Sequence, residues 1–187
     1  LGHDATLLAL AATAYRAVTR NASIAPQLIV GHGILGRLIA RIVIARGGPA
    51  PLVWEQSPAR RDGAAGYAVT EPDDNNASFA SIIDASGDPE IIDKAVARLS
   101  PRGEVILAGF YKESLSFRFA PAFMKEASIR ISTEFDAADM AGVLSLVEGG
   151  ALSLSGLVTH VKPVAQAGQA YEQAFDDPSC LKMVLDW

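Results

Sequence analysis

The chain has 187 residues, half of them hydrophobic, and a formal net charge of −5 at pH 7. This length suits one domain with a sizeable core. No apolar run approaches the roughly 18 residues of a membrane-spanning helix, so no transmembrane segment is expected. Lysines and arginines are scattered along an acidic chain, which argues against a nucleic-acid partner. With one cysteine, Cys180, and no basic leader, we expect a cytoplasmic protein with an inert, packed thiol.

The first segments predict a helix, a strand and a second helix. Residues 7–18 are rich in alanine and leucine, as is typical of a helix, and the apolar residues 27–30 predict a strand. The second helix extends to Arg46, with apolar residues at helical spacing and with Arg37 and Arg41 on other faces.

Between that strand and that helix stands the pattern GxGxxG. Gly31 would let the chain turn off the strand, Gly33 would let backbone N–H groups approach phosphates, and Gly36 would let the helix pack closely. The first N–H groups of a helix lack intrahelical partners and lie at its positive end, where an anion binds. A strand before the glycines and a helix after them favour a dinucleotide pyrophosphate site.

A second strand ends at Glu55, 19 residues after Gly36. A carboxylate there accepts hydrogen bonds from both adenosine ribose hydroxyls and repels a 2′-phosphate, which favours NAD over NADP. We include the next residue, Gln56, among the candidate cofactor contacts. Arg60 and Arg61, about a helical turn further on, are able to serve a 2′-phosphate. The alternative is that Glu55 is a solvated strand-end carboxylate and the arginines belong to a helix surface.

The remaining elements continue the alternation of strands and helices. They are strand 51–54, a short helix at 59–65, strand 67–70, a loop at 71–76, strand 79–83, a helix from Pro89 to Leu99, a turn at 101–103, strands 104–109 and 128–133, helix 139–147, strand-like 157–161, helix 166–175 and strand 182–185. This order predicts a single α/β domain over residues 1–187. We expect a Rossmann doubly wound parallel sheet of about six strands in the order 3-2-1-4-5-6, with a C-terminal helix and strand.

Ligands of such folds bind beyond the carboxyl ends of the strands. The residues that follow two central strands are therefore candidates to flank the adenine and nicotinamide halves of the cofactor: Ala85, Ser86 and Gly87, and Gly109, Phe110 and Tyr111. Each of them, taken singly, is also explained as an ordinary turn residue.

The sequence does not identify a catalytic proton-transfer group. His3, His32 and His160 are far apart, and one cysteine provides no zinc-ligand spacing, so no metal site is predicted. No tyrosine is followed four residues later by lysine, the pair used by short-chain reductases. His32 either touches phosphate or lies at the surface, and we favour a structural role for His160.

Several of these segments together resemble the nucleotide-binding half of medium-chain, zinc-type alcohol dehydrogenases. They are the lead-in helix TAYRAV, the GxGxxG turn, the Glu55 and Arg60 pair, the DASG turn, LVTH and the closing KMVL. Three longer stretches, LLALAATAYRAV, LAGFYKESLSFRFAPAFMKEASIRI and AFDDPSCLKMVLDW, are similar to the bacteriochlorophyll-pathway, and hence photosynthetic, branch of that family. This likeness implies NAD-dependent oxidation of the hydroxyethyl side chain of a chlorin ring to an acetyl group.

The resemblance also implies roles for the candidate cofactor residues. Gly33, Ile34 and Leu35 would present backbone to the pyrophosphate. Glu55 would hold the adenosine ribose, and Arg60 would flank the adenosine side.

The same resemblance implies contacts further along the cofactor. Ala85, Ser86, Gly109 and Phe110 would line the rest of the cleft, and Thr13 would face the nicotinamide.

The chain departs from the family in two ways. The usual cysteine zinc ligand has no counterpart, since Leu8 stands near that position, and the amino-terminal GroES-like catalytic domain is absent. We therefore expect a cofactor-binding fragment of a longer dehydrogenase, inactive by itself, which docks with that domain. A homodimer is a further expectation. The alternatives are a generic alcohol or polyol dehydrogenase domain, an S-adenosylmethionine-dependent methyltransferase, and an NADH-sensing module.

Overall fold

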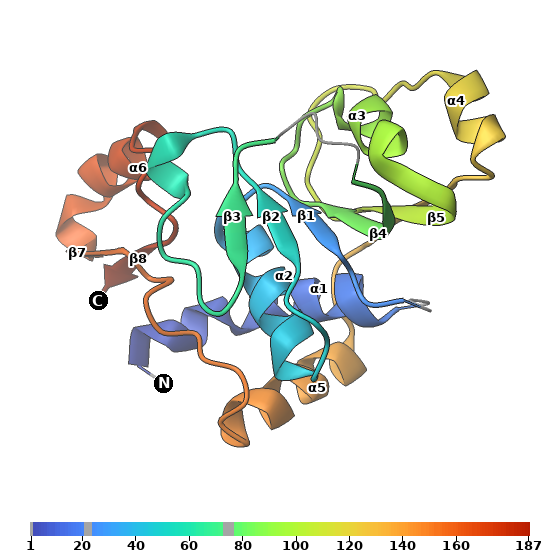
Figure 1. Cartoon of the computed structure of the whole chain (residues 1–187). Helices are drawn as coiled ribbons and strands as arrows, with labels where there is room; N and C mark the ends of the chain where they lie inside the picture. Colours follow the sequence, from blue (N-terminus) through green and yellow to red (C-terminus); the bar gives the residue numbers. More distant parts are fainter. Residues whose placement is uncertain (1, 21–23, 73–76) are drawn as a thin grey trace.

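A six-stranded parallel sheet forms the centre of the molecule (Figure 1). The computed structural model describes residues 2–20, 24–72 and 77–187. The strands are β1 (Leu28–Val30), β2 (Leu52–Trp54), β3 (Ala68–Thr70), β4 (Phe79–Asp84), β5 (Leu99–Leu107) and β6 (Ser128–Ile131). Their order is β3-β2-β1-β4-β5-β6, and neighbouring strands pair in parallel. The predicted doubly wound Rossmann fold is confirmed.

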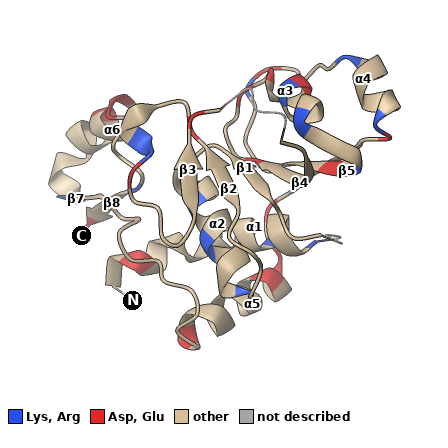
Figure 2. Ribbon diagram, viewed as in Figure 1, with Lys and Arg blue, Asp and Glu red and all other residues tan. Residues whose placement is uncertain are grey.

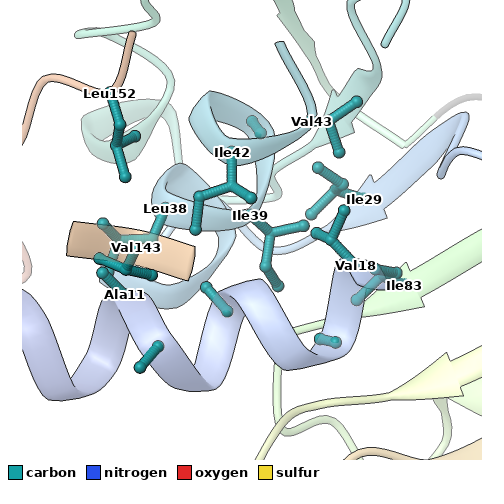
Figure 3. Packing of buried hydrophobic residues seen from close by; sticks show 14 of the residues in the cluster. Ala11, Val18, Ile29, Leu38, Ile39, Ile42, Val43, Ile83, Val143 and Leu152 are labelled. Carbon is teal, nitrogen blue, oxygen red and sulfur yellow. The ribbon is translucent and has the colours of Figure 1, made fainter. Parts of the chain in front are cut away.

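Helices cover both faces of the sheet. One face packs on α1 (Leu8–Thr19), α2 (Ile34–Ala45) and α5 (Ala137–Glu148), and the other on α3 (Ile91–Arg98) and the short α4 (Phe119–Met124). Figure 3 shows Val143 of α5 next to Leu38 of α2 and Ala11 of α1. Because parallel strands are buried on both faces, β1 is apolar at every position rather than alternating.

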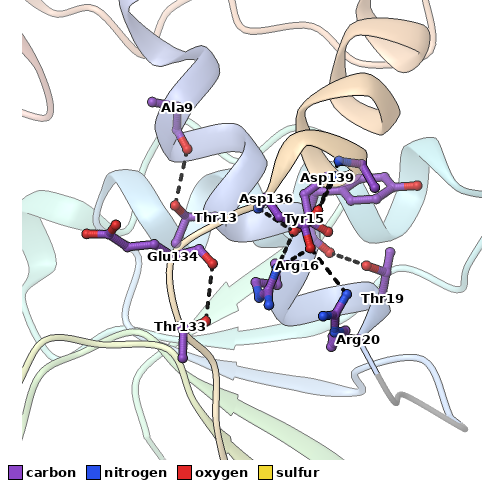
Figure 4. Close-up of polar contacts among 11 residues, drawn as sticks. Ala9, Thr13, Tyr15, Arg16, Thr19, Arg20, Thr133, Glu134, Asp136 and Asp139 are labelled. Carbon is purple, nitrogen blue, oxygen red and sulfur yellow. Dashed lines mark hydrogen bonds and ion pairs between the residues drawn. The ribbon is translucent and has the colours of Figure 1, made fainter.

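Polar contacts fix α1 against the start of α5 (Figure 4). Asp136 and Asp139 form a capping box, in which the side chain of each residue accepts a hydrogen bond from the backbone N–H of the other. Arg16 of α1 donates to both carboxylates at 2.9 and 2.7 Å. These contacts join α1 to α5, and none of the three residues lines the cleft described below.

The C-terminal residues form a small separate unit. The strands β7 (His160–Pro163) and β8 (Met183–Asp186) make a two-stranded parallel sheet, joined through η3 (Val164–Gln166) and α6 (Ala167–Asp176). This unit lies beside η1 (Gly2–Leu7), to the left in Figure 1. The predicted C-terminal helix and strand are therefore present.

Several predicted segments differ from the structure. The helix expected at 59–65 is only the 3-10 turn η2 (Pro58–Arg60), because Gly63 and Gly66 adopt positive φ and stop it. The turn expected at 101–103 lies within β5, where Arg102 has φ of +60° and its N–H bonds to the Lys125 carbonyl. Helix α4 was not predicted.

Smaller differences concern element ends. Helix α3 begins at Ile91 and ends at Arg98, β5 ends at Leu107 rather than 109, β6 ends at Ile131, and β7 starts at His160 rather than 157. In the loop predicted at 71–76, residues 73–76 lie outside the described part of the chain. None of these shifts changes the sheet order.

Candidate cofactor site

A cleft of about 780 Å³ opens at the carboxyl ends of the central strands. Eight of the predicted contacts line it, namely Gly31, Gly33, Glu55, Gln56, Arg60, Ala85, Ser86 and Gly87. Its remaining walls come from the ends of β1 and β2, the turn after β4, helix α3, Pro72 and Arg118. The strand order runs outward from β1 to β2 and β3 in one direction and from β4 to β5 and β6 in the other. The cleft lies at this switch point between β1 and β4, where such sheets bind ligands.

The glycine turn has the geometry that its sequence predicts. Gly31 has φ of +97°, and a Cβ there would come within 3.0 Å of the Ser86 backbone. At Gly36 a Cβ would meet the Gly31 carbonyl oxygen at 1.9 Å, so α2 sits directly on the turn. Gly33 is the N-cap of α2, no side chain caps the helix, and a Cβ at Gly33 would meet nothing within 4 Å. The start of α2 therefore presents N–H groups toward open space.

Glu55 ties the end of β2 to the glycine turn. It is largely buried, its Oε2 accepts the His32 N–H at 2.8 Å, and its Oε1 accepts the Ser57 N–H at 2.8 Å. A carboxylate has about four acceptor positions, so two remain for a ligand. The alternative of a solvated strand-end carboxylate does not fit this burial.

Arg60 and Arg61 both use their guanidinium groups on the protein. Arg60 donates from Nε to the Pro178 carbonyl at 3.0 Å. Arg61 donates to the carbonyls of Glu55 and Gln56. Basic side chains elsewhere are spread over several elements in the view of Figure 2.

A basic cluster of His32, Arg37 and Tyr67 lies under the glycine turn. His32 has no exposed surface, so the expectation of a phosphate contact or a surface side chain is wrong. Its Nδ1 lies 2.6 Å from the Arg60 carbonyl and its Nε2 lies 2.9 Å from the Tyr67 hydroxyl. Burial lowers the pKa of His32, and also that of Arg37.

Arg37 also lies elsewhere than its sequence predicts. We expected it on an outer face of α2, but it is only 6% exposed. Its guanidinium donates to four main-chain carbonyls, those of His32, Arg60, Asp62 and Gly63, at 2.7 to 3.2 Å. A helical period marks a charged residue as outward-facing, so it gave no signal of this burial.

An acidic cluster of Asp84, Ser86 and Tyr111 lies on the other side of Gly31. Asp84 is fully buried, and its Oδ1 accepts the Ser86 N–H at 3.1 Å and the Ser86 hydroxyl at 2.6 Å. The Tyr111 hydroxyl donates to Oδ2 of Asp84. Burial raises the pKa of Asp84, and burial next to this carboxyl raises the pKa of Tyr111. The cluster joins the turns that follow β4 and β5.

Other predicted contacts lie outside the lining of the cleft. Ile34 and Leu35 pack partly against the core at the start of α2, and the Thr13 hydroxyl donates to the Ala9 carbonyl within α1 (Figure 4). Gly109 lies against the backbone of Gly87. Phe110 is 91% exposed and contributes no wall to the cleft.

The remaining candidates have structural surroundings. His160 lies 2.9 Å from the Thr159 hydroxyl and 3.8 Å from Asp177, and Cys180 is half-buried. Within residues 2–20, 24–72 and 77–187, no three His, Cys, Asp or Glu residues group as metal ligands. In the same ranges, no helix is both long and apolar enough to cross a membrane.

Comparison with known proteins identifies close relatives. No family model matches the chain. It is 53% identical, over its whole length, to 2-desacetyl-2-hydroxyethyl bacteriochlorophyllide A dehydrogenase of Rhodobacter capsulatus, and 53% identical over 98% of its length to the protein of that name from Cereibacter sphaeroides. Both relatives are named as dehydrogenases, and the chain is similar to each of them. The resemblance inferred from the sequence is thus confirmed, and the chain spans about 60% of the length of these two relatives.

More distant proteins share the fold. A D-xylulose reductase A of Aspergillus oryzae is 25% identical over 83% of the chain and 49% of its own length. A protein described as a short-chain alcohol dehydrogenase of Escherichia coli, solved with NADH, has a TM-score of 0.84 at 21% identity over 98% of this chain and 59% of its own. A zinc-binding dehydrogenase of Sinorhizobium meliloti, solved with NADP, has a TM-score of 0.77 at 14% identity over 97% and 58%.

Proposed function

We propose that the chain is the NAD-binding domain of a dehydrogenase that oxidises a secondary alcohol to a ketone. The observation that carries this proposal is the glycine turn at the head of α2, open toward the cleft, with Glu55 at the end of β2 beside it. No side chain caps α2, so its first N–H groups are available to the pyrophosphate oxygens. The residues present therefore fit a dinucleotide.

The proposed preference for NAD over NADP depends on charge near the ribose. Glu55 is the carboxylate that lines this end of the cleft, and its free acceptor positions suit the two ribose hydroxyls. A 2′-phosphate would be repelled by it. The nearby cations of Arg60 and Arg61 already donate to main-chain carbonyls, which leaves them less available to a phosphate.

The proposed substrate is the 3-hydroxyethyl group of bacteriochlorophyllide a, which would become an acetyl group. The two relatives at 53% identity are named for a hydroxyethyl bacteriochlorophyllide, 2-desacetyl-2-hydroxyethyl bacteriochlorophyllide A, which supports a substrate of this class. The bound nicotinamide would supply the chemistry by accepting a hydride from the alcohol carbon, while the hydroxyl proton leaves to a base. Gly109 and Phe110, after β5, lie outside the lining of the cleft, and a contact with the nicotinamide stays a prediction for both. A polyol substrate is the alternative, supported by the relative at 25% identity.

We further propose that the chain works as part of a longer enzyme. The C-terminal unit exposes Tyr171, Phe175 and Trp187, which are 61%, 83% and 97% accessible. A two-stranded parallel sheet with apolar side chains in solvent suits a surface that a second domain covers. A catalytic domain of the same protein is the proposed partner. A cytoplasmic location and a homodimer remain predictions.

The function is tested by titrating this chain with NADH, NADPH and S-adenosylmethionine in a calorimeter. We expect NADH to bind, with NADPH and S-adenosylmethionine much weaker. The matched variant is Gly33→Asp, because aspartate is a favoured N-cap and a Cβ there meets no atom, so the fold should persist. Its charge should lower NADH affinity at least about tenfold. Binding of S-adenosylmethionine in place of NADH, or unchanged NADH affinity in Gly33→Asp, would contradict the proposal.

A further inference from the structure

The basic cluster of His32, Arg37 and Tyr67 lies against the adenosine side of the cleft without lining it. We propose that Arg37 and His32 are positioning residues that fix segment 60–63 against the glycine turn, and thereby set the preference for NADH over NADPH. This inference rests on the proposed function, because it concerns how that site distinguishes two cofactors.

The first step is the way that Arg37 holds main chain. Nε donates to the His32 carbonyl at 3.0 Å, and Nη1 donates to the Gly63 carbonyl at 3.2 Å. Nη2 donates to the carbonyls of Arg60 at 3.0 Å and Asp62 at 2.7 Å. One buried cation thus joins the glycine turn to a segment more than 20 positions later. Guanidinium has a rigid fork of five donors, which a lysine ammonium does not reproduce.

The second step is that His32 uses every polar group it has. Its backbone N–H donates to Glu55, and its carbonyl accepts from Arg37. Since a carbonyl only accepts, the ring must donate from Nδ1 to the Arg60 carbonyl, and Nε2 then accepts from the Tyr67 hydroxyl. The carboxylate proposed to meet the ribose is therefore connected, through His32, to the same segment that Arg37 holds.

The third step concerns Gly63, which makes room for the guanidinium. A Cβ at Gly63 would come within 2.5 Å of Nη1 of Arg37, and the residue has φ of +80°. Arg37 is buried and bound at four carbonyls, so it has little freedom to move aside. Gly63→Ala would thus displace the guanidinium without removing it, by a route independent of any change at position 37.

The consequence for specificity follows from Arg60. Its carbonyl accepts from both His32 and Arg37, so its backbone is fixed, while its side chain points a donor at Pro178. Held this way, segment 60–63 keeps its cations from turning toward a 2′-phosphate and leaves Glu55 as the charged group beside the ribose. Loosening segment 60–63 would let Arg60 or Arg61 approach the 2′-phosphate of NADPH. The affinities for NADPH and NADH would therefore change unequally.

The test measures the ratio of the dissociation constants for NADPH and NADH on the 187-residue chain. We expect Arg37→Lys and Gly63→Ala each to lower this ratio by about tenfold. The double variant should lower it no further than the stronger single variant, because both changes act on one guanidinium. Tyr67→Phe, which removes one hydroxyl, should lower it less and provides a folded variant should Arg37→Lys not fold.

Arg16→Lys is the matched control. Arg16 has a side chain that is 15% exposed and donates two hydrogen bonds, but it joins α1 to α5 and does not line the cleft. The variant Arg16→Lys should reduce the melting temperature of the chain and leave the ratio of the NADPH and NADH dissociation constants unchanged. The inference would be overturned if every folded variant of the basic cluster kept the ratio of the NADPH and NADH dissociation constants within about twofold of its value in the unsubstituted chain. The cluster would then have a purely structural role. Failure of the unchanged chain to bind NADH would instead overturn the proposed function, and the inference with it.

Discussion

The basic and acidic clusters stand on opposite sides of Gly31, and they solve the burial of polar groups differently. In the basic cluster a cation, Arg37, is surrounded by main-chain carbonyls. In the acidic cluster a carboxyl group, Asp84, is surrounded by two hydroxyls and a backbone N–H. In both clusters, hydrogen bonds rather than an opposite charge offset the free-energy cost of removing the ionisable group from water.

The difference lies in what each cluster fixes. Carbonyl acceptors belong to the backbone, so Arg37 holds the course of segment 60–63. The donors of the acidic cluster are mostly side chains, so Asp84 orients Ser86 and Tyr111 within turns that the ends of β4 and β5 already place. We conclude that the side of the cleft at segment 60–63 depends on a buried side chain for its backbone conformation, whereas the side at the ends of β4 and β5 depends mainly on the sheet.

The largest effect should come from removing the two central groups. Arg37→Met leaves four carbonyls without their donor and should lower the free energy of unfolding by about 3–5 kcal/mol. Asp84→Asn keeps the shape and one acceptor, and should cost about 2 kcal/mol. Urea unfolding measures both. Equal losses would contradict the distinction between a cluster that fixes backbone and one that fixes side chains.

A control for that comparison is Arg16→Met. Arg16 binds two carboxylates at the edge of the core, one of them 44% exposed, and its loss should cost much less than the loss of Arg37. A loss as large as that of Arg37→Met would mean that the effect reflects any arginine with several hydrogen bonds.

The two clusters should also give stability opposite pH dependences. The pKa of His32 is below its ordinary 6.5 in the folded protein, so the unfolded chain binds more protons there. The free energy of unfolding is therefore highest above pH 6.5 and falls as the pH drops below that value. The pKa of Asp84 lies above 3.8, so the folded protein takes up its proton first, and the contribution of Asp84 improves as the pH falls toward 3.8.

Two variants separate these contributions. Urea unfolding from pH 8 to pH 4 should show a smaller loss below pH 6.5 in His32→Gln than in the unchanged chain. Asp84→Asn should show a larger total loss on acidification, because the compensating proton uptake is gone. If neither variant changes the slope of the free energy of unfolding against pH, other groups control the loss of stability in acid.

The sequence predicted the region at the ends of β4 and β5, which depends on the sheet, better than segment 60–63, which depends on Arg37. Strand order, the turn at Gly31 to Gly36 and Asp84 at the end of β4 follow from local patterns of apolar residues and glycine, and the structure agrees. Arg37 and His32 were misplaced, because their burial depends on carbonyls of residues 60–63, which are remote in sequence.

The same reason explains the error at residues 59–65. The segment carries helix-forming residues, but its carbonyls bond to Arg37 and His32 instead of to N–H groups one turn later. A local propensity was overruled by long-range hydrogen bonds. Gly63 and Gly66 are the local signs, since glycine interrupts a helix, and the missing Cβ at Gly63 leaves room for the guanidinium.

The smallest effect should come from the two tyrosines, which form a matched pair. Each donates one hydroxyl hydrogen bond to a buried group of its cluster, so Tyr67→Phe and Tyr111→Phe remove the same atom. The acceptor differs, since Tyr67 donates to a neutral imidazole and Tyr111 to a carboxyl group. Bonds to charged acceptors contribute more, so Tyr111→Phe should cost about 1 kcal/mol more than Tyr67→Phe. Urea unfolding at pH 7 gives both values, and at a pH below the pKa of Asp84 the difference should shrink, because the acceptor has then lost its charge. A difference that stays constant with pH would show that Asp84 is already neutral at pH 7, and that both clusters hold their hydroxyls with uncharged acceptors.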